Sequence, residues 1–306
     1  MRKLGLLILL IGCYPALRAQ PPQRLPVYSI NNMILPAEMD KQVCISGMKY
    51  FNGSLCLVSE RCPMIFMLDP QTAAITRTIN LQIPYTFEME GMTSYKDQLY
   101  LVSEEKAAIY EVNMQTGVAR SIETSVAIPK KSKDGDGIEG IAANETNNKF
   151  YLLRERNEDQ TKAQIYTFRI ENGNTGSSLI LKYESVIEIP LETPQWRYSD
   201  ISYDIANSRL ICLKSNAKGK LRQLFLESIA IDNDGKLLPG SLSNISVENL
   251  TETAGTYKTQ GYSTNLEGIT IDNAGNIFIV SDNHSGPAKC GQPAKEKTIL
   301  LQLSRK

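Results

Sequence analysis

Five short motifs in the chain place an oxygen-bearing side chain at the same point of a repeated frame. In three of them an apolar residue precedes Glu-Gly, as in Met89-Glu90-Gly91, and in two a serine takes the place of the glutamate, as in Ile45-Ser46-Gly47. The repeated residues are Ser46, Glu90, Glu139, Ser199 and Glu267. Completed by water, such an all-oxygen set suits Ca²⁺, which accepts about six to eight ligands, better than Mg²⁺, which requires near-octahedral geometry.

The same motifs also have a purely structural interpretation. Glycine in a strand allows a neighbouring backbone to approach closely, and the glutamate would then simply face water in a channel. However, the position is Ser or Glu in all five units, and carboxylates that converge without a cation repel one another. We therefore expect a calcium site at these residues.

A second set of polar and charged residues follows the apolar run that comes after each motif. Its members are Glu60, Arg61, Glu104, Glu105, Arg154, Glu155, Arg156, Lys214, Asn216, Asp282, Asn283 and His284. Arginine and lysine bind anions, and a neighbouring metal ion polarises a phosphoryl oxygen. We predict that Arg61, Glu104, Arg154, Arg156, Lys214, Asp282 and His284 bind an anionic small molecule.

The alternative for this second set is a solvated rim in which basic and acidic side chains pair with each other. His284 is the only histidine of the chain, and the Ser285-Gly286-Pro287 sequence after it is typical of a turn. Nothing near it marks a nucleophile, so no Ser-His-Asp arrangement is predicted and the catalytic residues stay unassigned.

The residues between the motifs define the elements that must position these side chains. Each motif begins an apolar segment, and a turn such as Phe51-Asn52-Gly53 joins it to a second apolar run, which third and fourth runs follow in most units. Four short strands per unit, in a repeat whose connections lengthen toward the C-terminus, are typical of β-propeller blades. Because the first strand of a blade is innermost, the motif residues are expected to meet around a central channel.

The last unit stops after its third run, and residues 27–35 ahead of the first repeat are expected to supply the missing strand. Such closure removes the open sheet edges that invite aggregation. We therefore predict an all-β, five-bladed β-propeller closed by an N-terminal strand. A six-bladed ring is the alternative, because the long unit between Ser199 and Glu267 has room for further strands. No stretch of helical period competes with this interpretation.

The composition limits the class of partner. The chain of 306 residues carries 33 basic and 33 acidic residues, a formal net charge of +0. A nucleic-acid partner would require a basic face, so none is predicted.

The N-terminus reads as a targeting segment. Met1-Arg2-Lys3 is basic, the apolar stretch that follows is too short to span a bilayer, and residues 1–19 form a signal peptide ahead of a single domain over 20–306. In the alternative, Leu10-Ile11-Gly12-Cys13 is a bacterial lipobox, residues 1–12 are removed, and a lipid on Cys13 is the only membrane attachment. Either way the protein is expected to be exported, as a periplasmic protein, an outer-membrane lipoprotein or a secreted one.

The cysteines leave two interpretations open. Cys62 and Cys290 follow the second strands of the first and last blades, which are neighbours in a closed ring, so they form either a disulfide or two free thiols. Cys56 and Cys212 lie within apolar runs and are expected to be buried apolar residues.

The chain resembles the SdiA-regulated family of exported bacterial propellers from about Cys44 to Leu303. The resemblance lies in the order of the motifs, which is Ile-Ser-Gly, Glu-Gly, Glu-Gly, Ser-Asp and Glu-Gly, and in the Leu-Val-Ser-Glu ends of the second runs. The Ser, Glu, Glu, Ser, Glu order is also similar to the calcium-activated nucleotidase (apyrase) family, most closely at residues 197–201 and 213–215. The resemblance implies a five-bladed ring with Ca²⁺ at the five motif residues. That family's catalytic positions are not carried over, because they do not align with the second set of residues.

Two functions are consistent with these features. The first is an exported calcium-binding propeller of the cell envelope that binds a ligand or an envelope protein, and the alternative is a calcium-dependent phosphoester or nucleotide hydrolase. A basic loop at residues 130–136 is either a contact site or a solvated loop. The fold does not choose between these functions, because propellers serve many.

Overall fold

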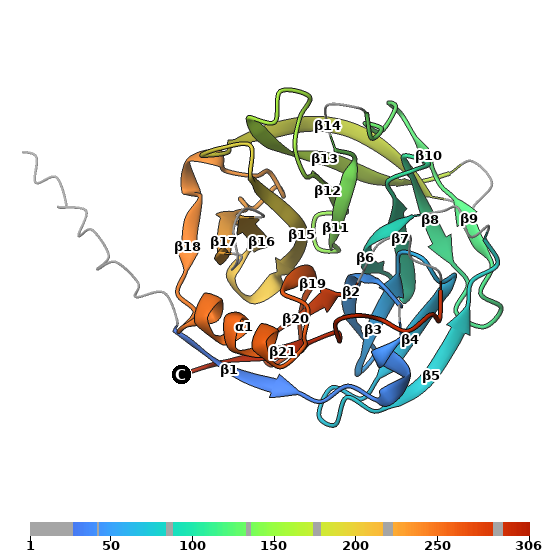
Figure 1. Cartoon of the computed structure of the whole chain (residues 1–306). Coiled ribbons are helices and arrows are strands. Elements are labelled where there is room, and N and C mark those ends of the chain that lie inside the picture. Colours follow the sequence, from blue (N-terminus) through green and yellow to red (C-terminus); the bar gives the residue numbers. More distant parts are fainter. Residues whose placement is uncertain are drawn as a thin grey trace, which may run out of the picture.

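The structure is a computed structural model that describes residues 27–41, 43–83, 88–132, 136–173, 179–216, 223–283 and 290–306. Within these residues the strands form five sheets arranged as a ring around a central axis (Figure 1). The all-β, five-bladed propeller predicted from the sequence is therefore confirmed. The predicted leader, with Cys13, lies outside the described residues.

Each blade is a meander of four antiparallel strands that runs from the axis outward. The bounds are β2 (Ile45–Phe51), β3 (Ser54–Ser59), β4 (Met64–Leu68) and β5 (Ile75–Asn80) in blade one; β6 (Met89–Tyr95), β7 (Gln98–Ser103), β8 (Ala108–Val112) and β9 (Ala119–Ser121) in blade two; β11 (Ile138–Asn144), β12 (Lys149–Arg154), β13 (Lys162–Asn172) and β14 (Leu179–Pro190) in blade three; and β15 (Trp196–Asp204), β16 (Arg209–Asn216), β17 (Gln223–Ala230) and β18 (Ser243–Ile245) in blade four. A short strand, β10 (Glu123–Thr124), adds to the outer edge of blade three, parallel to β14.

The ring closes through blade five, which combines both ends of the described chain. Its strands are β19 (Asn265–Ile271), β20 (Ile277–Asp282), β21 (Leu300–Arg305) and, outermost, β1 (Tyr28–Met33). β1 pairs antiparallel with β21 over its whole length, from Tyr28 opposite Arg305 to Met33 opposite Leu300. The predicted N-terminal closing strand is confirmed.

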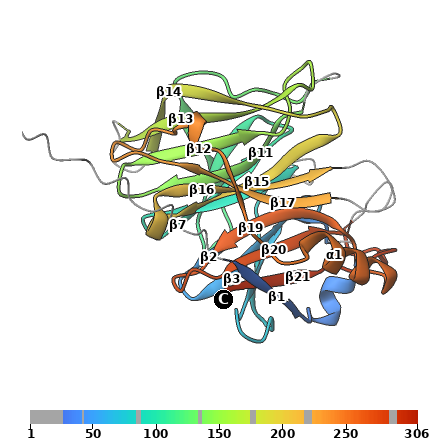
Figure 2. The same ribbon diagram turned by 90° about the vertical axis from the view of Figure 1, so that its left-hand side faces the viewer.

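The long connection before blade five contains a helix rather than a sixth blade. Here α1 (Leu250–Thr259) follows β18, and it lies on one face of the disc (Figure 2). Only Leu250 and Ala254 of this helix are buried, so it lacks the apolar stripe by which a helix is recognised in sequence. Short 3-10 turns occur at Ala37–Asp40, Ile205–Asn207 and Pro239–Ser241. Among the described helices none is long and apolar enough to span a membrane.

The apolar core is divided among the interfaces between neighbouring blades. One cluster of buried side chains fills each described interface; Tyr95, Tyr100 and Phe150, for example, pack edge to face between blades two and three. Cys56 and Cys212 are fully buried within two of these clusters, as predicted. Blade packing therefore fixes the inner strands whose first residues surround the axis.

A disulfide joins the first blade to the last. Cys62, in the loop after β3, is bonded to Cys290 in the loop after β20, with a Cα–Cα distance of 5.0 Å. Of the two interpretations of these cysteines, the disulfide is the one that the structure confirms. It also fixes the loop that carries Glu60 and Arg61.

Candidate functional site

A β-bulge occurs in every inner strand, and the bulged residue is in each case the repeated motif residue. In blade one, for example, Ile45 lies opposite Ser59 and Gly47 opposite Val58, so Ser46 is left without a partner on β3. The same shift leaves Glu90, Glu139, Ser199 and Glu267 unpaired in the other four blades. A bulge re-aims the side chain of the extra residue.

The glycine after the bulge is required because adjacent inner strands lie very close together. A Cβ atom on Gly91 would lie 2.7 Å from the carbonyl oxygen of Glu139, and one on Gly47 would lie 2.8 Å from that of Glu90. Blade four has Asp200 in place of the glycine. Its buried carboxylate accepts the backbone N–H of Ile269 at 2.8 Å and so links blades four and five.

Four of the five motif residues line one cavity of about 480 Å³ on the axis. The lining residues are Ser46, Glu60, Glu90, Glu104, Lys131, Asp136, Glu139, Glu155, Arg156, Arg197, Lys258, Ser263, Thr264, Asn265, Glu267, Asp282 and Glu296. The fifth motif residue, Ser199, is buried, and its hydroxyl donates a hydrogen bond to the carbonyl of Leu266 at 2.9 Å. Its side chain therefore links neighbouring inner strands.

The cavity is strongly acidic. Among its described lining residues nine are carboxylic acids and four are basic, an excess of five formal negative charges when all are ionised. Burial, together with Glu60, Glu104 and Glu267, raises the pKa of Glu90 well above its ordinary value. Burial likewise raises the pKa of Glu139, with Glu90 and Glu155 adding to the effect. Such an arrangement favours either protons or a bound cation.

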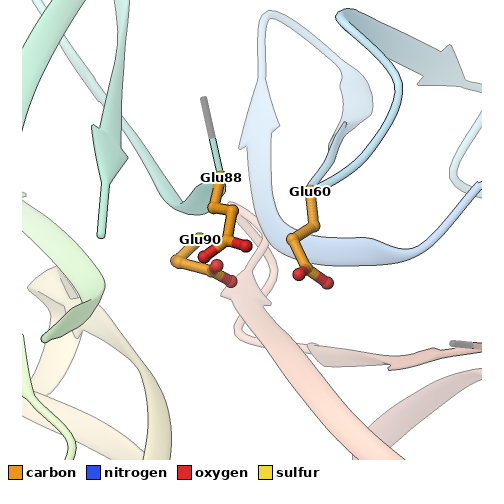
Figure 3. A group of neighbouring side chains, drawn as sticks. All are labelled: Glu60, Glu88 and Glu90. Carbon is orange, nitrogen blue, oxygen red and sulfur yellow. The ribbon is translucent and has the colours of Figure 1, made fainter. Parts of the chain in front are cut away.

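Three carboxylates converge between blades one and two. Oxygens of Glu60, Glu88 and Glu90 all lie within 4.8 Å of one another, and the three side chains converge in Figure 3. The Ser46 hydroxyl donates to the carboxylate of Glu90 at 2.5 Å. Burial raises the pKa of Glu60 to about 7, with Glu88 and Glu267 adding to it, although Arg61 acts in the opposite direction.

This cluster fits a hard cation. Oxygen ligands lie about 2.3–2.6 Å from Ca²⁺, so two ligands on opposite sides of the ion are about 5 Å apart. The 4.8 Å span of the three carboxylates agrees with that, and the donors are all oxygen. The residues that would hold Ca²⁺ are Glu60, Glu88 and Glu90, with the Ser46 hydroxyl beside them.

The opposite side of the cavity holds an arginine. Nη1 of Arg197 lies 3.0 Å from Glu155, and Nη2 lies 2.6 Å from Glu267 and 2.7 Å from the side-chain oxygen of Asn265. Although burial opposes its charge, Glu267, Glu155 and Glu139 raise the pKa of Arg197 well above its ordinary value. The guanidinium therefore neutralises carboxylates of blades three and five.

The basic loop at residues 130–136 contributes to the cavity in its described part. Lys131 Nζ lies 2.5 Å from the buried carboxylate of Glu104, which also accepts the backbone N–H of Gly137 at 2.8 Å. Asp136 pairs with Arg156 at 2.5 Å. The described part of this loop therefore packs against the wall of the cavity.

The structure places the seven residues predicted to bind an anion in different surroundings. Glu104, Arg156 and Asp282 line the cavity. Arg61 is paired beside it, 2.6 Å from Glu60 and 2.7 Å from Glu88. His284 lies outside the described residues.

The other two residues are held away from the cavity, which corrects the expectation that they bind the anion there. Arg154 is buried against the carbonyl of Asp136 and pairs with Glu158 at 2.7 Å. Lys214 pairs with Glu192 at 2.7 Å and with Glu227 at 3.0 Å. Both side chains are buried and engaged in ion pairs with other protein residues, and neither lines the cavity.

Sequence reasoning missed Glu88 and Arg197, and a common signal identifies them. Each lies two residues before a repeated motif residue, as does Asn265 before Glu267. In an extended chain, residues two apart lie on the same face. In blades two, four and five the residue two positions before the motif therefore carries a polar side chain toward the site, whereas blades one and three have Cys44 and Gly137 there, so the five-fold repeat does not reveal it.

The fold and the site define a five-bladed β-propeller with an acidic cavity on its axis. The chain belongs to the phytase-like family, whose description is "Esterase-like activity of phytase" and whose model matches residues 45–284. This is a different family from the SdiA-regulated and nucleotidase families that the motifs resemble. No curated relative matches the chain.

One solved structure supports the fold. Glutaminyl cyclase from Myxococcus xanthus is similar with a TM-score of 0.52 at 10% identity, over 92% of this chain and 100% of that one. The PQQ-bound aldose sugar dehydrogenase from Streptomyces coelicolor is similar with a TM-score of 0.47 at 10% identity, over 91% and 100%. At such identities the likeness concerns the arrangement of blades and says nothing of the reaction.

Proposed function

We propose that the protein is an exported, calcium-dependent phosphoester hydrolase whose reaction takes place in the axial cavity. The observation that carries this proposal is the convergence of Glu88 with Glu60 and Glu90, two residues that line a cavity which also holds basic side chains. The family's description as esterase-like supports hydrolysis over binding alone. Calcium would supply charge neutralisation and polarise a phosphoryl oxygen.

The remaining cavity residues have separate tasks in this proposal. Lys258 lines the cavity beside the carboxylates and would hold the phosphate group, together with Arg156 when the ion pair of Arg156 with Asp136 opens. Glu139, which lines the cavity, would accept a proton from the attacking water in its ionised form.

The test is turnover of a panel of phosphomonoesters and nucleotides that includes phytate, by the purified mature domain with Ca²⁺ or with chelator. We expect hydrolysis only with Ca²⁺. Glu90→Gln should lose both calcium binding and turnover, whereas Glu139→Gln should retain calcium and lose turnover if Glu139 is the base. Glu252→Gln, at an exposed position of α1, is the matched control. Loss of calcium binding in Glu139→Gln would instead make Glu139 a ligand, as the repeated motif predicts.

A calcium-stabilised binding protein is the second candidate, and one observation favours it. Arg61, Arg154 and Lys214 are all paired with carboxylates, which leaves fewer cations to hold a phosphate than the sequence indicates. Calcium binding without turnover across the whole panel would favour this function, with an anionic small molecule or an envelope protein as the partner. A nucleic-acid partner is not part of either proposal, because the net charge is zero.

Export is also part of the proposal. The Cys62–Cys290 disulfide supports it, because disulfides persist in oxidising compartments such as the periplasm. Fractionation of cells that express the full chain tests both leader interpretations. Membrane association that is lost in Cys13→Ala would show a lipoprotein, and a soluble exported product unchanged by Cys13→Ala would show an ordinary signal peptide. Retention in the cytoplasm would contradict export.

A further inference from the structure

Arg197 has a place in the cavity that no other described cation shares. It comes from inner strand β15 of blade four and reaches blade three through Glu155 and blade five through Glu267. A third contact, to Asn265, fixes the same guanidinium. Its fork is therefore occupied by protein acceptors, so it is not free to take a phosphate group.

The two sides of the cavity differ in how their carboxylates are neutralised. On the side of blades three to five, Arg197 offsets the charge of Glu155 and Glu267, and Glu139 also raises its pKa. On the side of blades one and two, Glu60, Glu88 and Glu90 converge with Arg61 as their closest basic partner. Each half contains an arginine that contacts two blades, but the side chain of Arg61 is 31% exposed, whereas that of Arg197 is 16% exposed and has the third contact to Asn265.

Building on the calcium site proposed above, we propose that Arg197 is a built-in counter-ion that takes the place of a second metal ion. The native cavity then binds one Ca²⁺, at Glu60, Glu88 and Glu90. The carboxylates of Glu155 and Glu267 form a latent second site that the guanidinium keeps closed. Arg197 is a positioning residue in this scheme, and it determines the number of metal ions rather than touching the substrate.

The test is the number of Ca²⁺ ions bound by the mature domain, measured by isothermal titration and by native mass spectrometry. We expect one ion for the wild type and two for Arg197→Met, because the methionine keeps the apolar stem and removes the charge. Arg197→Lys keeps the charge and is the matched control, with one ion expected. The double variant Arg197→Met/Glu267→Gln should return to one ion, because the latent site has lost a carboxylate.

The inference is wrong if the wild type binds two ions in the cavity, or if folded Arg197→Met binds no more ions than the wild type. The wild-type count and the lysine variant keep the inference open to refutation even if Arg197→Met does not fold. No ion in the wild type but one in Arg197→Met would overturn the proposed calcium-dependent function and support the role of Arg197. One ion in both would overturn the role of Arg197 and leave the proposed function intact.

Discussion

The ion-free protein is expected to lose stability as the pH rises from 5 to 8. Burial raises the pKa of Glu60 to about 7, and it raises those of Glu90 and Glu139 well above the ordinary value. In the unfolded chain these carboxyl groups titrate near about 4.3. Between the two pKa values the folded protein holds protons that the unfolded chain has released, so the stabilisation is complete below pH 4 and is lost as the pH passes the folded-state pKa.

The size of the effect follows from the separation of the two pKa values. For Glu60, whose side chain is 14% exposed, the full separation corresponds to about 4 kcal/mol, at about 1.4 kcal/mol per pH unit. Ca²⁺ holds the carboxylates ionised and should flatten this pH dependence. The same linkage makes the dissociation constant of Ca²⁺ rise about tenfold between pH 8 and pH 6 from Glu60 alone.

The assay is urea unfolding at a series of pH values, in chelator and in saturating Ca²⁺. Glu60→Gln should remove about 3 kcal/mol of the loss between pH 5 and pH 8, and Glu252→Gln should leave it unchanged. A stability that rises with pH in chelator, or a slope that Glu60→Gln leaves intact, would refute the raised pKa of Glu60 in this cluster.

Three further predictions concern the frame of the site. Gly91→Ala should cost about 1–3 kcal/mol of unfolding free energy because its Cβ would meet the neighbouring inner strand at 2.7 Å, whereas Gly240→Ala, with nothing within 4 Å, should stay within about 0.5 kcal/mol in thermal unfolding. Cys62→Ser should cost about 2–5 kcal/mol and weaken calcium binding in a titration, since the disulfide fixes the loop of the cation cluster; unchanged affinity would contradict this. Arg156→Ala should reduce turnover at an almost unchanged melting temperature, and Arg154→Ala should lower the melting temperature instead; the reverse result would place the anion site at Arg154.

The fold could be predicted from the sequence because the repeated glycine reflects a steric requirement of the inner strands. A residue after the bulge must be small where two inner strands approach within contact distance, so glycine recurs at Gly47, Gly91 and Gly140. Blade four is the exception, because Asp200 takes the place of the glycine. Its carboxylate accepts the backbone N–H of Ile269 and so joins blade four to blade five. Ring closure could likewise be predicted, because the last unit lacks one strand and β1 supplies it.

The details of the site were less accessible, for a physical reason. Which basic side chain faces the cavity depends on where a strand ends: Arg154 is the last residue of β12 and turns to Glu158, while Arg156 follows in the loop and lines the cavity. Helix α1 was missed because its buried residues are too few to show a periodic pattern, although it brings Lys258 to the cavity.

The chemistry of the cavity comes from the departures from five-fold symmetry. Glutamate at all five bulges would place equal charge around the axis, and a cation would then have no preferred side. Serine in blades one and four reduces the charge, and Arg197 on blade four neutralises the carboxylates of its neighbours. The remaining charge lies between blades one and two, where Glu88 adds a carboxylate and the disulfide holds Glu60 in place. A single ion bound off the axis leaves the other half of the cavity for a ligand, whereas an ion bound at the centre would not. Replacement of Arg197 should therefore change both the number of bound metal ions and the size of the ligand that the cavity accepts.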